Sequence, residues 1–250
     1  MKIEFSHKSR AFTVDLNKGL DVSLPLEHQS PLGAWYLDPP RIEAVRTAEF
    51  IGEVSEGSPV NFRNIFFNPH AHTTHTESLA HISTEDVPVN SIFSRFHFVA
   101  LVHSIEPEEV QGDRVLMESD TLKENLNSFS PEAILIRTFP NDSDKKKRNY
   151  SHTNPAYMSL SLTKLLRDGG IQHLLIDTPS VDREEDGGAL AAHHTFWNYP
   201  ENMRREASIS EFIFVPNEVP DGLYLLNLVP ANIRNDAAIS RPILFPMVPK

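Results

Sequence analysis

The feature that most constrains the fold is an alternation of apolar runs and amphipathic segments in the second half of the chain. Apolar runs of strand length cover residues 133–139, 171–177, 210–215 and 222–228. Helix-like segments separate some of them, at 159–170, where leucines precede Gly169, and at 187–197. The first half contains mainly strand-like runs, with a hairpin predicted over 2–5 and 11–16 and strands over 41–54 and 96–105. Asp120 is a candidate cap for a short helix that follows it.

Strands followed by alternating strands and helices predict an α/β fold, with a mixed sheet or a small barrel and flanking helices. The chain has 250 residues, and no change of composition marks a boundary within it. We therefore predict a single domain over 1–250, since one core can serve a chain of this length.

Charge and cysteine content exclude several classes of protein. The net charge of −11 argues against nucleic-acid and anionic-membrane partners, and the short run 144–148 is predicted to be a solvated loop. The absence of cysteine excludes disulfides, thiolate metal sites and a cysteine nucleophile. No apolar run approaches the ~20 residues of a membrane helix, and the first residues lack the apolar core of a signal peptide. These features predict a soluble cytoplasmic protein.

Histidine is the residue that points to chemistry. Four of the 12 histidines lie within 68–82, at His70, His72, His75 and His81, together with Glu77. In an extended chain His75 and Glu77 project from one face. Imidazole and carboxylate without sulfur suit Zn, Mn or Fe(II). The alternative interpretation is a surface loop that happens to be rich in histidine.

Two downstream features strengthen the metal interpretation. His193 and His194 lie in the predicted helix 187–197, and Glu211 enters the apolar run 210–215. A buried carboxylate needs a partner, because an unpaired one is costly. That partner is either a metal ion or a cation such as Arg241.

Several phrases of the chain resemble the metal-dependent cyclase family, which contains bacterial kynurenine formamidases (arylformamidases) and isatin hydrolase. The family motif is His-x-Gly-Thr-His-x-Asp-x-Pro-x-His, followed later by Asp-x-His-His and a glutamate. The matching segments are Trp35 in GAWYLDPP, Thr74–Glu77 with His81, LLIDTPSVD at 174–182, His193 and His194, Glu211, and ISRPILF at 239–245. They follow the family order over nearly the whole chain.

The chain departs from the motif in three places. Glu77 replaces the family aspartate and Thr73 the glycine, and a strict register puts Ala71 at the first histidine. A loop that is one residue longer would bring His70 into that role, with His72 as the competing candidate.

The resemblance implies a swivelling β/β/α-type fold and one or two divalent ions, Zn or Mn. The implied metal ligands are His70, His75 and Glu77 for one ion and His193 for a second, with Glu77 and Glu211 bridging both. His81 is implied as the proton carrier and Trp35 as a substrate contact, while His194 either packs or orients its neighbour. Phe66 and Phe67 would form an aryl-binding wall or, as the favoured alternative, belong to the core.

The activity that the resemblance implies is hydrolysis of a small aryl N-acyl or cyclic amide. Hydroxide formed on the metal attacks the carbonyl, and a histidine protonates the leaving nitrogen. The leading substrate is N-formylkynurenine, cleaved to kynurenine and formate in tryptophan catabolism. The alternatives are an isatin-type cyclic amide and a non-catalytic metal- or ligand-binding member. Analogy with the family also predicts a homodimer or homotetramer.

Overall fold

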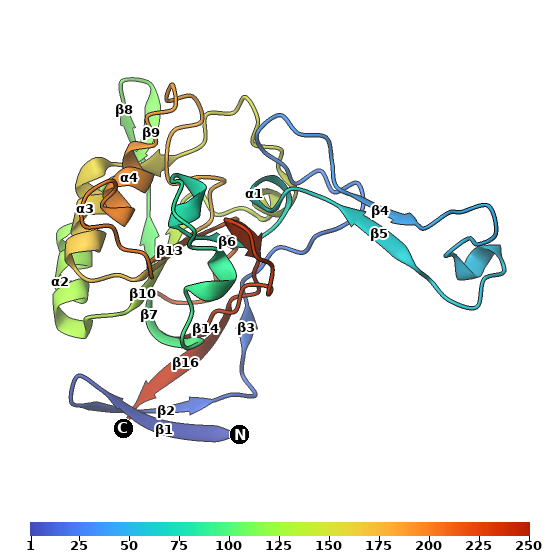
Figure 1. Ribbon diagram of the computed structural model, residues 1–250. Helices are drawn as coiled ribbons and strands as arrows, with labels where there is room; N and C mark the ends of the chain where they lie inside the picture. The colour runs from blue at the N-terminus through green and yellow to red at the C-terminus, as the bar shows by residue number, and fades with distance from the viewer.

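The computed structural model describes residues 1–250 and is organised around one large, open, mixed sheet (Figure 1). Its strands lie in the order β1-β2-β16-β14-β7-β10-β12-β13-β6-β15, with β3 paired to β16. Their bounds are β1 Lys2–His7, β2 Arg10–Asp15, β3 Leu20–Asp21, β6 His75–Glu77, β7 His97–Ile105, β10 Ala133–Thr138, β12 His173–Ile176, β13 Ser208–Glu211, β14 Gly222–Asn227, β15 Ala237–Ile239 and β16 Ile243–Pro249.

The centre of the sheet is parallel and buried on both faces. β7, β10, β12 and β13 run parallel, and antiparallel strands flank them on both sides. Along β10, Ile134 and Ile136 join the core under the helices, while Leu135 joins the core on the opposite face. This two-sided burial explains why these strands read as continuous apolar runs rather than as alternating ones.

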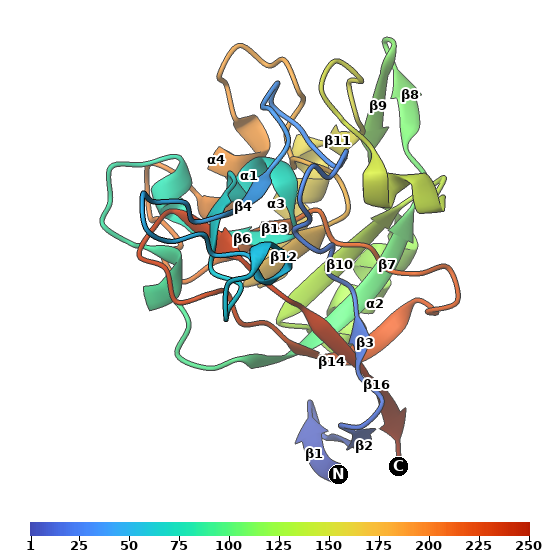
Figure 2. The same ribbon diagram turned by 90° about the vertical axis from the view of Figure 1, so that its right-hand side faces the viewer.

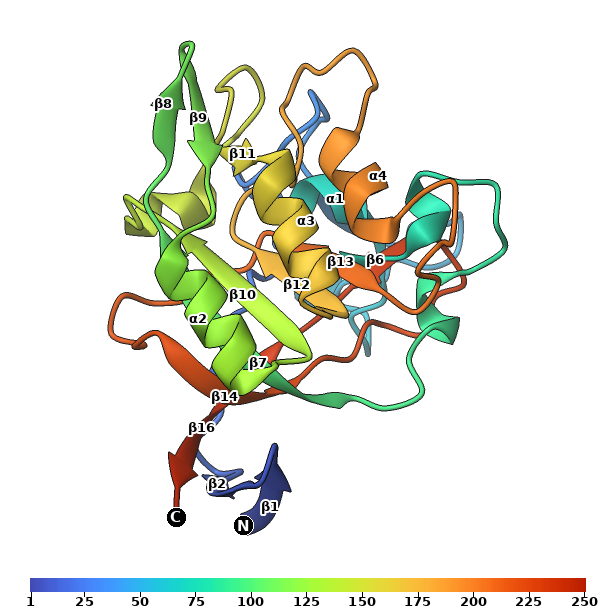
Figure 3. The same cartoon turned by 90° about the vertical axis from the view of Figure 1, so that its left-hand side faces the viewer.

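Three helices cover one face of this parallel centre: α2 Asp120–Phe129, α3 Leu160–Asp168 and α4 Ala191–Trp197 (Figure 3). The side chain of Ser119 caps α2 and that of Ser159 caps α3, each by accepting the backbone N–H of the third helical residue. The predicted cap Asp120 is instead the first helical residue. α3 ends before Gly169, as the leucine pattern predicts.

The remaining elements are short. A small sheet contains β8 Glu108–Val110, β9 Asp113–Leu116 and β11 Tyr157–Met158, and a two-stranded hairpin contains β4 Arg41–Ala44 and β5 Arg63–Phe66. The short helices are α1 Pro69–His72, η1 Val54–Glu56, η2 Leu79–His81, η3 Val89–Ser91 and η4 Ser143–Lys147. The β4–β5 hairpin projects away from the rest of the molecule (Figure 1) and points toward the viewer in Figure 2.

The mixed sheet with flanking helices is confirmed, and the alternative of a small barrel is wrong because the sheet stays open. Three local predictions also need correction. Only residues 41–44 of the expected strand 41–54 are extended, β13 ends at Glu211 instead of starting there, and Lys145 of the basic run is buried against Asp177 at 2.9 Å. None of the helices is both long and apolar enough to span a bilayer.

Candidate metal centre

The base of the site is formed by two paired strands, β6 and β13. Their register places His75 opposite Glu211 and Glu77 opposite Ile209, so these side chains share one face. His75 Nε2 lies 3.3 Å from Glu211 Oε2. β15 pairs with the other edge of β6, with Ala237 opposite Glu77, so the backbone that carries Glu77 is held on both sides.

α1 brings a second histidine to Glu77. This single helical turn starts with Pro69, and the side chain of Asn68 accepts the backbone N–H of His70 at 2.9 Å. His70 Nδ1 then lies 3.2 Å from Glu77 Oε2. The indole N–H of Trp35 donates to the backbone carbonyl of His70 at 3.1 Å, which ties the two segments together.

α4 brings a third histidine from the opposite side. His193 Nε2 lies 3.0 Å from Glu77 Oε1 and 3.9 Å from Glu211 Oε1. The Asp182 carboxylate accepts the backbone N–H groups of Ala192 at 2.6 Å and His193 at 3.1 Å, and it lies 2.6 Å from His193 Nδ1. Asp182 therefore caps α4 and orients the His193 ring with Nε2 toward Glu77.

His81, at the end of η2, completes the cluster. Its Nε2 lies 3.8 Å from Glu77 Oε2, and its ring stacks on that of His70 with centroids 4.3 Å apart. The Asp236 carboxylate serves both rings, with Oδ2 at 3.2 Å from His81 Nδ1 and 2.9 Å from His70 Nε2. His81 is thus close enough to be a ligand as well as a proton carrier, because one ligand atom each of His70, Glu77 and His81 lies within 4.8 Å of the others.

Burial and charge set the protonation of these groups. Burial opposes charge on His193, but hydrogen bonds to Asp182 and Glu77 outweigh it and raise the pKa to about 10. The same balance, with Asp236 and Glu77 as partners, raises the pKa of His70 to about 10. Burial would raise the pKa of Glu77, yet the surrounding histidines hold it well below its usual range. The cluster therefore combines a carboxylate with imidazolium groups when no other cation is bound.

A cavity of about 350 Å³ opens onto this cluster. Its apolar lining comes from Trp35, Leu37 and Leu190, and its polar lining includes His70, His81, His193, Glu211, Asn68 and Ser180. Trp35, predicted as a substrate contact, therefore lies in the cavity wall beside the histidines. The lining thus combines aromatic and apolar side chains with titratable ones, which suits a small, mostly apolar ligand with one polar group.

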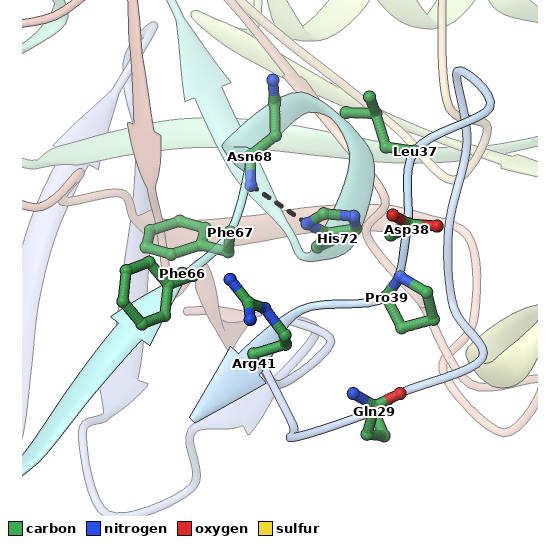
Figure 4. Close-up of a pocket in the computed structure, with 9 residues that line it drawn as sticks. All are labelled: Gln29, Leu37, Asp38, Pro39, Arg41, Phe66, Phe67, Asn68 and His72. Atoms are coloured by element: carbon green, nitrogen blue, oxygen red, sulfur yellow. Dashed lines mark hydrogen bonds between the residues drawn. The ribbon is translucent and has the colours of Figure 1, made fainter. Parts of the chain in front are cut away.

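Two secondary candidates lie outside the cluster. His72 accepts the backbone N–H of Asn68 at 3.0 Å and lines a different cavity, together with Arg41, Phe66 and Phe67 (Figure 4). Phe66 is exposed, so its assignment to the core is wrong. His194 packs its ring against Tyr199 at a centroid distance of 5.1 Å. Arg241 pairs with Asp21 at 2.7 Å rather than with Glu211.

Asp182 and Asp236 were not singled out from the sequence. Asp182 ends the segment 174–182 quoted for the family resemblance, so its position offered a signal that could have been used. Asp236 lies in the segment NIRNDAAIS, which carries no motif in the pattern described above. Its role becomes visible only because β15 pairs with β6 and brings residue 236 beside the histidines.

Comparisons with known proteins identify a family and several similar folds. Residues 20–183, about two thirds of the chain, match the model of a family described as "Putative cyclase". An isatin hydrolase bound to the product analogue thioisatinate has a similar structure, with a TM-score of 0.63, 17% identity and coverage of 93% of both chains. Isatin hydrolase A from Labrenzia aggregata, bound to benzyl benzoate, gives a TM-score of 0.64 at 16% identity, covering 91% of this chain and 93% of that one.

A further similar structure is described as a potential metal-dependent hydrolase with cyclase activity, with a TM-score of 0.61, 16% identity and coverage of 91% of this chain and 97% of that one. At identities this low, the similarity shows a shared fold and nothing more specific. The comparison with curated protein sequences gives no match.

Proposed function

The chain belongs to the cyclase family, and on that premise we propose that it is a metal-dependent hydrolase of small aryl N-acyl or cyclic amides. The observation that carries the proposal is the convergence of His70, His75, His193 and Glu211 on the fully buried Glu77, beside a cavity lined by Trp35 and by His70, His193 and Glu211 themselves. Four separate segments supply these groups, and a chance histidine-rich loop would not assemble them.

The donor set fits a divalent cation. His75 Nε2 and Glu77 Oε2 are buried and make no well-aligned hydrogen bond, although buried polar atoms are almost always satisfied. Their nearest polar neighbours are other donors of the cluster, Glu211 Oε2 at 3.3 Å and His70 Nδ1 at 3.2 Å. Both atoms face the other donors of the cluster. His70, His75, Glu77, His193 and Glu211 would hold one or two such ions, and Glu77 and Glu211 each have two carboxylate oxygens to offer them. Imidazoles and carboxylates favour Zn or Mn.

When bound, such an ion lowers the pKa of water toward ~7 and polarises a carbonyl. The residues of the chain supply the remaining functions. Asp182 holds His193 in one orientation, and Asp236 does the same for His70 and His81. His81 lines the cavity, and its Nε2 would move a proton to the leaving nitrogen while Nδ1 stays paired with Asp236. Trp35 and Leu190 exclude water from one side of the substrate.

The dimensions of the cavity favour a substrate with one aromatic ring. We place N-formylkynurenine first, cleaved to kynurenine and formate, because the arylformamidase resemblance includes Trp35 and the order of the motifs. Hydrolysis of an isatin-type cyclic amide is the second candidate, and the fold shared with two isatin hydrolases supports it.

The test is metal analysis of protein purified without chelator, followed by assays with N-formylkynurenine, formanilide and isatin. We expect more than ~0.5 Zn or Mn per chain, with turnover that chelation abolishes and metal restores. A protein that binds metal but hydrolyses none of the three would instead be a non-catalytic member of the fold. Protein that stays metal-free and melts unchanged after addition of Zn or Mn would contradict the proposal.

A further inference from the structure

The turn that carries Trp35 has an unusual backbone. Residues 34–37 form a turn in which the N–H of Leu37 donates to the carbonyl of Ala34 at 3.4 Å. Both central residues, Trp35 and Tyr36, have positive φ, at 61° and 62°. Turns with positive φ at both central positions normally take asparagine and glycine, because a bulky side chain is strained there. Two aromatic residues therefore keep this conformation only because the surrounding structure stabilises it.

The same kind of strain recurs elsewhere at the cavity of the metal centre. Leu190, which also contributes to its apolar lining, has a φ of 44°, and Phe212, which directly follows the lining residue Glu211, has a φ of 56°. All other non-glycine residues with positive φ are polar or charged. Backbone strain on hydrophobic residues is thus concentrated at this cavity, and strain of that kind is typical of functional sites.

Glu184 connects the strained turn to the loop 183–190. Its Oε1 accepts a hydrogen bond from the hydroxyl of Tyr36 at 2.9 Å. The same carboxylate accepts the backbone N–H groups of His152 at 2.5 Å and Asn154 at 2.8 Å. Burial alone would raise the pKa of Glu184, but these hydrogen bonds outweigh it and lower the pKa. Glu184 therefore stays ionised at neutral pH, and it accepts hydrogen bonds from two segments that are distant in sequence.

Further contacts attach each partner of this hydrogen bond to its own segment. The backbone N–H of Tyr36 donates to Ser151 Oγ at 3.0 Å, and its ring lies against that of His152 with centroids 4.5 Å apart. In the loop, the Asp186 carboxylate accepts the backbone N–H of Leu190 at 2.7 Å. The bond between the tyrosine hydroxyl and the glutamate then joins the segment before the metal-binding strands to the segment that leads into α4.

We propose that Tyr36 and Glu184 are positioning residues that fix the apolar lining of the substrate cavity. Their hydrogen bond would hold Trp35 and Leu190 in the orientation that packs against an aryl group, so the inference rests on the proposed function. Tyr36 is 52% exposed and adds little to the core, so its contacts serve the turn rather than global stability. Without the bond the turn can relax toward negative φ and carry the indole out of the lining. Binding of the aryl group should then weaken, while the metal ligands, which lie on other elements, stay in place.

The first test is kinetic, with formanilide as the aryl substrate and metal content measured in parallel. Tyr36→Phe removes only the hydroxyl, and Glu184→Gln keeps the length and removes the charge. Each should raise KM about tenfold, the size expected for one hydrogen bond, while kcat stays within about twofold and metal content is unchanged. The double variant should be no worse than Glu184→Gln alone, because both substitutions break the same bond.

Tyr224→Phe is the matched control for the kinetic test. It removes a tyrosine hydroxyl that donates to the Pro220 carbonyl at 2.8 Å, in a core cluster that contains none of the cavity residues. We expect its KM to equal that of wild type.

The second measurement needs neither turnover nor metal. The chain has two tryptophans and Trp197 is fully buried, so acrylamide quenching of tryptophan fluorescence reports mainly on Trp35. Tyr36→Phe and Glu184→Gln should show a severalfold larger quenching constant than wild type and the control. Unchanged quenching in both variants, effects that add in full in the double variant, or a loss of kcat at constant KM would overturn the proposal. A protein that hydrolyses no aryl amide but shows the change in quenching would refute the proposed function while supporting the role of this bond in holding Trp35.

Discussion

Shortening Glu77 by one methylene is the most direct test of the site, because the family motif has an aspartate at this position. The carboxylate of Glu77 reaches two histidines on two different elements, His70 on α1 and His193 on α4. Its backbone cannot follow a shorter side chain easily, since β6 is paired with β13 on one edge and with β15 on the other. We therefore expect Glu77→Asp to impair the site rather than restore it.

The size of the effect follows from the geometry. One carbon–carbon bond retracts the carboxylate by about 1.5 Å. The present separation of 3.0 Å between Glu77 Oε1 and His193 Nε2 leaves room for one shared cation, and metal sites tolerate only about ±0.2 Å in each ligand distance. Disturbing the groups that orient ligands already costs about 10–100-fold in metal affinity. Moving a ligand itself should cost at least ~100-fold, or about 2.8 kcal/mol.

The assay is a paired measurement of metals per chain and kcat/KM for wild type and Glu77→Asp. Glu77→Gln serves as the matched variant, because it keeps the length and removes the charge. We expect both variants to lose metal, which would show that reach and charge are both required. If Glu77→Asp binds as much metal and turns over as fast as wild type, the reasoning from backbone restraint is wrong, and Glu77 is a neutral departure from the family motif.

Three further outcomes can be checked. His81→Ala should lower kcat by about 10²–10⁴ while metal content stays intact, whereas His75→Ala should lose both; equal metal loss in the two would make His81 a ligand. Metal uptake at pH 8 should release up to about two protons, because the pKa values of His70 and His193 are raised to about 10 in the metal-free site. Calorimetry in buffers of different ionisation enthalpy measures the number of protons released. Metal binding with no proton release would contradict this prediction. Burial lowers the pKa of His173 to about 3, so as the pH falls the unfolded chain binds a proton at this residue before the folded protein does. The free energy of unfolding therefore falls between pH ~6.5 and ~3, by about 2 kcal/mol at pH 5. Urea unfolding at pH 7 and pH 5 measures this loss, and the His173→Gln variant should not show it. An unchanged pH dependence in that variant would refute the assignment.

The parts of the fold that were predictable from the sequence are those fixed by local pattern. The amphipathic spacing of the leucines in 160–166 predicts α3, and the glycine that follows them predicts its end. The structure has both, with the helix ending before Gly169. The apolar run 133–139 becomes the fully buried β10. Where the apolar residues of a segment follow one clear periodicity, only one type of secondary structure buries all of them.

Local pattern fails where a distant residue decides the outcome. Lys145 lies in a basic run, yet it turns inward because its ammonium group donates a hydrogen bond of 2.9 Å to the carboxylate of the buried Asp177, 32 residues away. Phe66 lies in an apolar phrase that suggests core, yet the hairpin carries it outward, so it is exposed. The type of residue was informative in both cases, but its surroundings were set by tertiary contacts that a single sequence does not display.

In the candidate site, too, local sequence spacing identifies some residues and tertiary contacts supply the others. The protonation of the site depends on these contacts, because they determine which charges surround each histidine. Spacing identifies the histidines, but an isolated imidazole has a pKa near 6.5 and no reason to hold a proton at neutral pH. Four carboxylates converge on four imidazoles in the structure: Glu77, Glu211, Asp182 and Asp236 on His70, His75, His81 and His193. Two of these carboxylates were not anticipated, and they raise the negative charge of the cluster to a level that demands compensation. Protons on His70 and His193 provide it in the metal-free protein, and a divalent cation would replace them, so metal affinity should increase as pH rises toward 10.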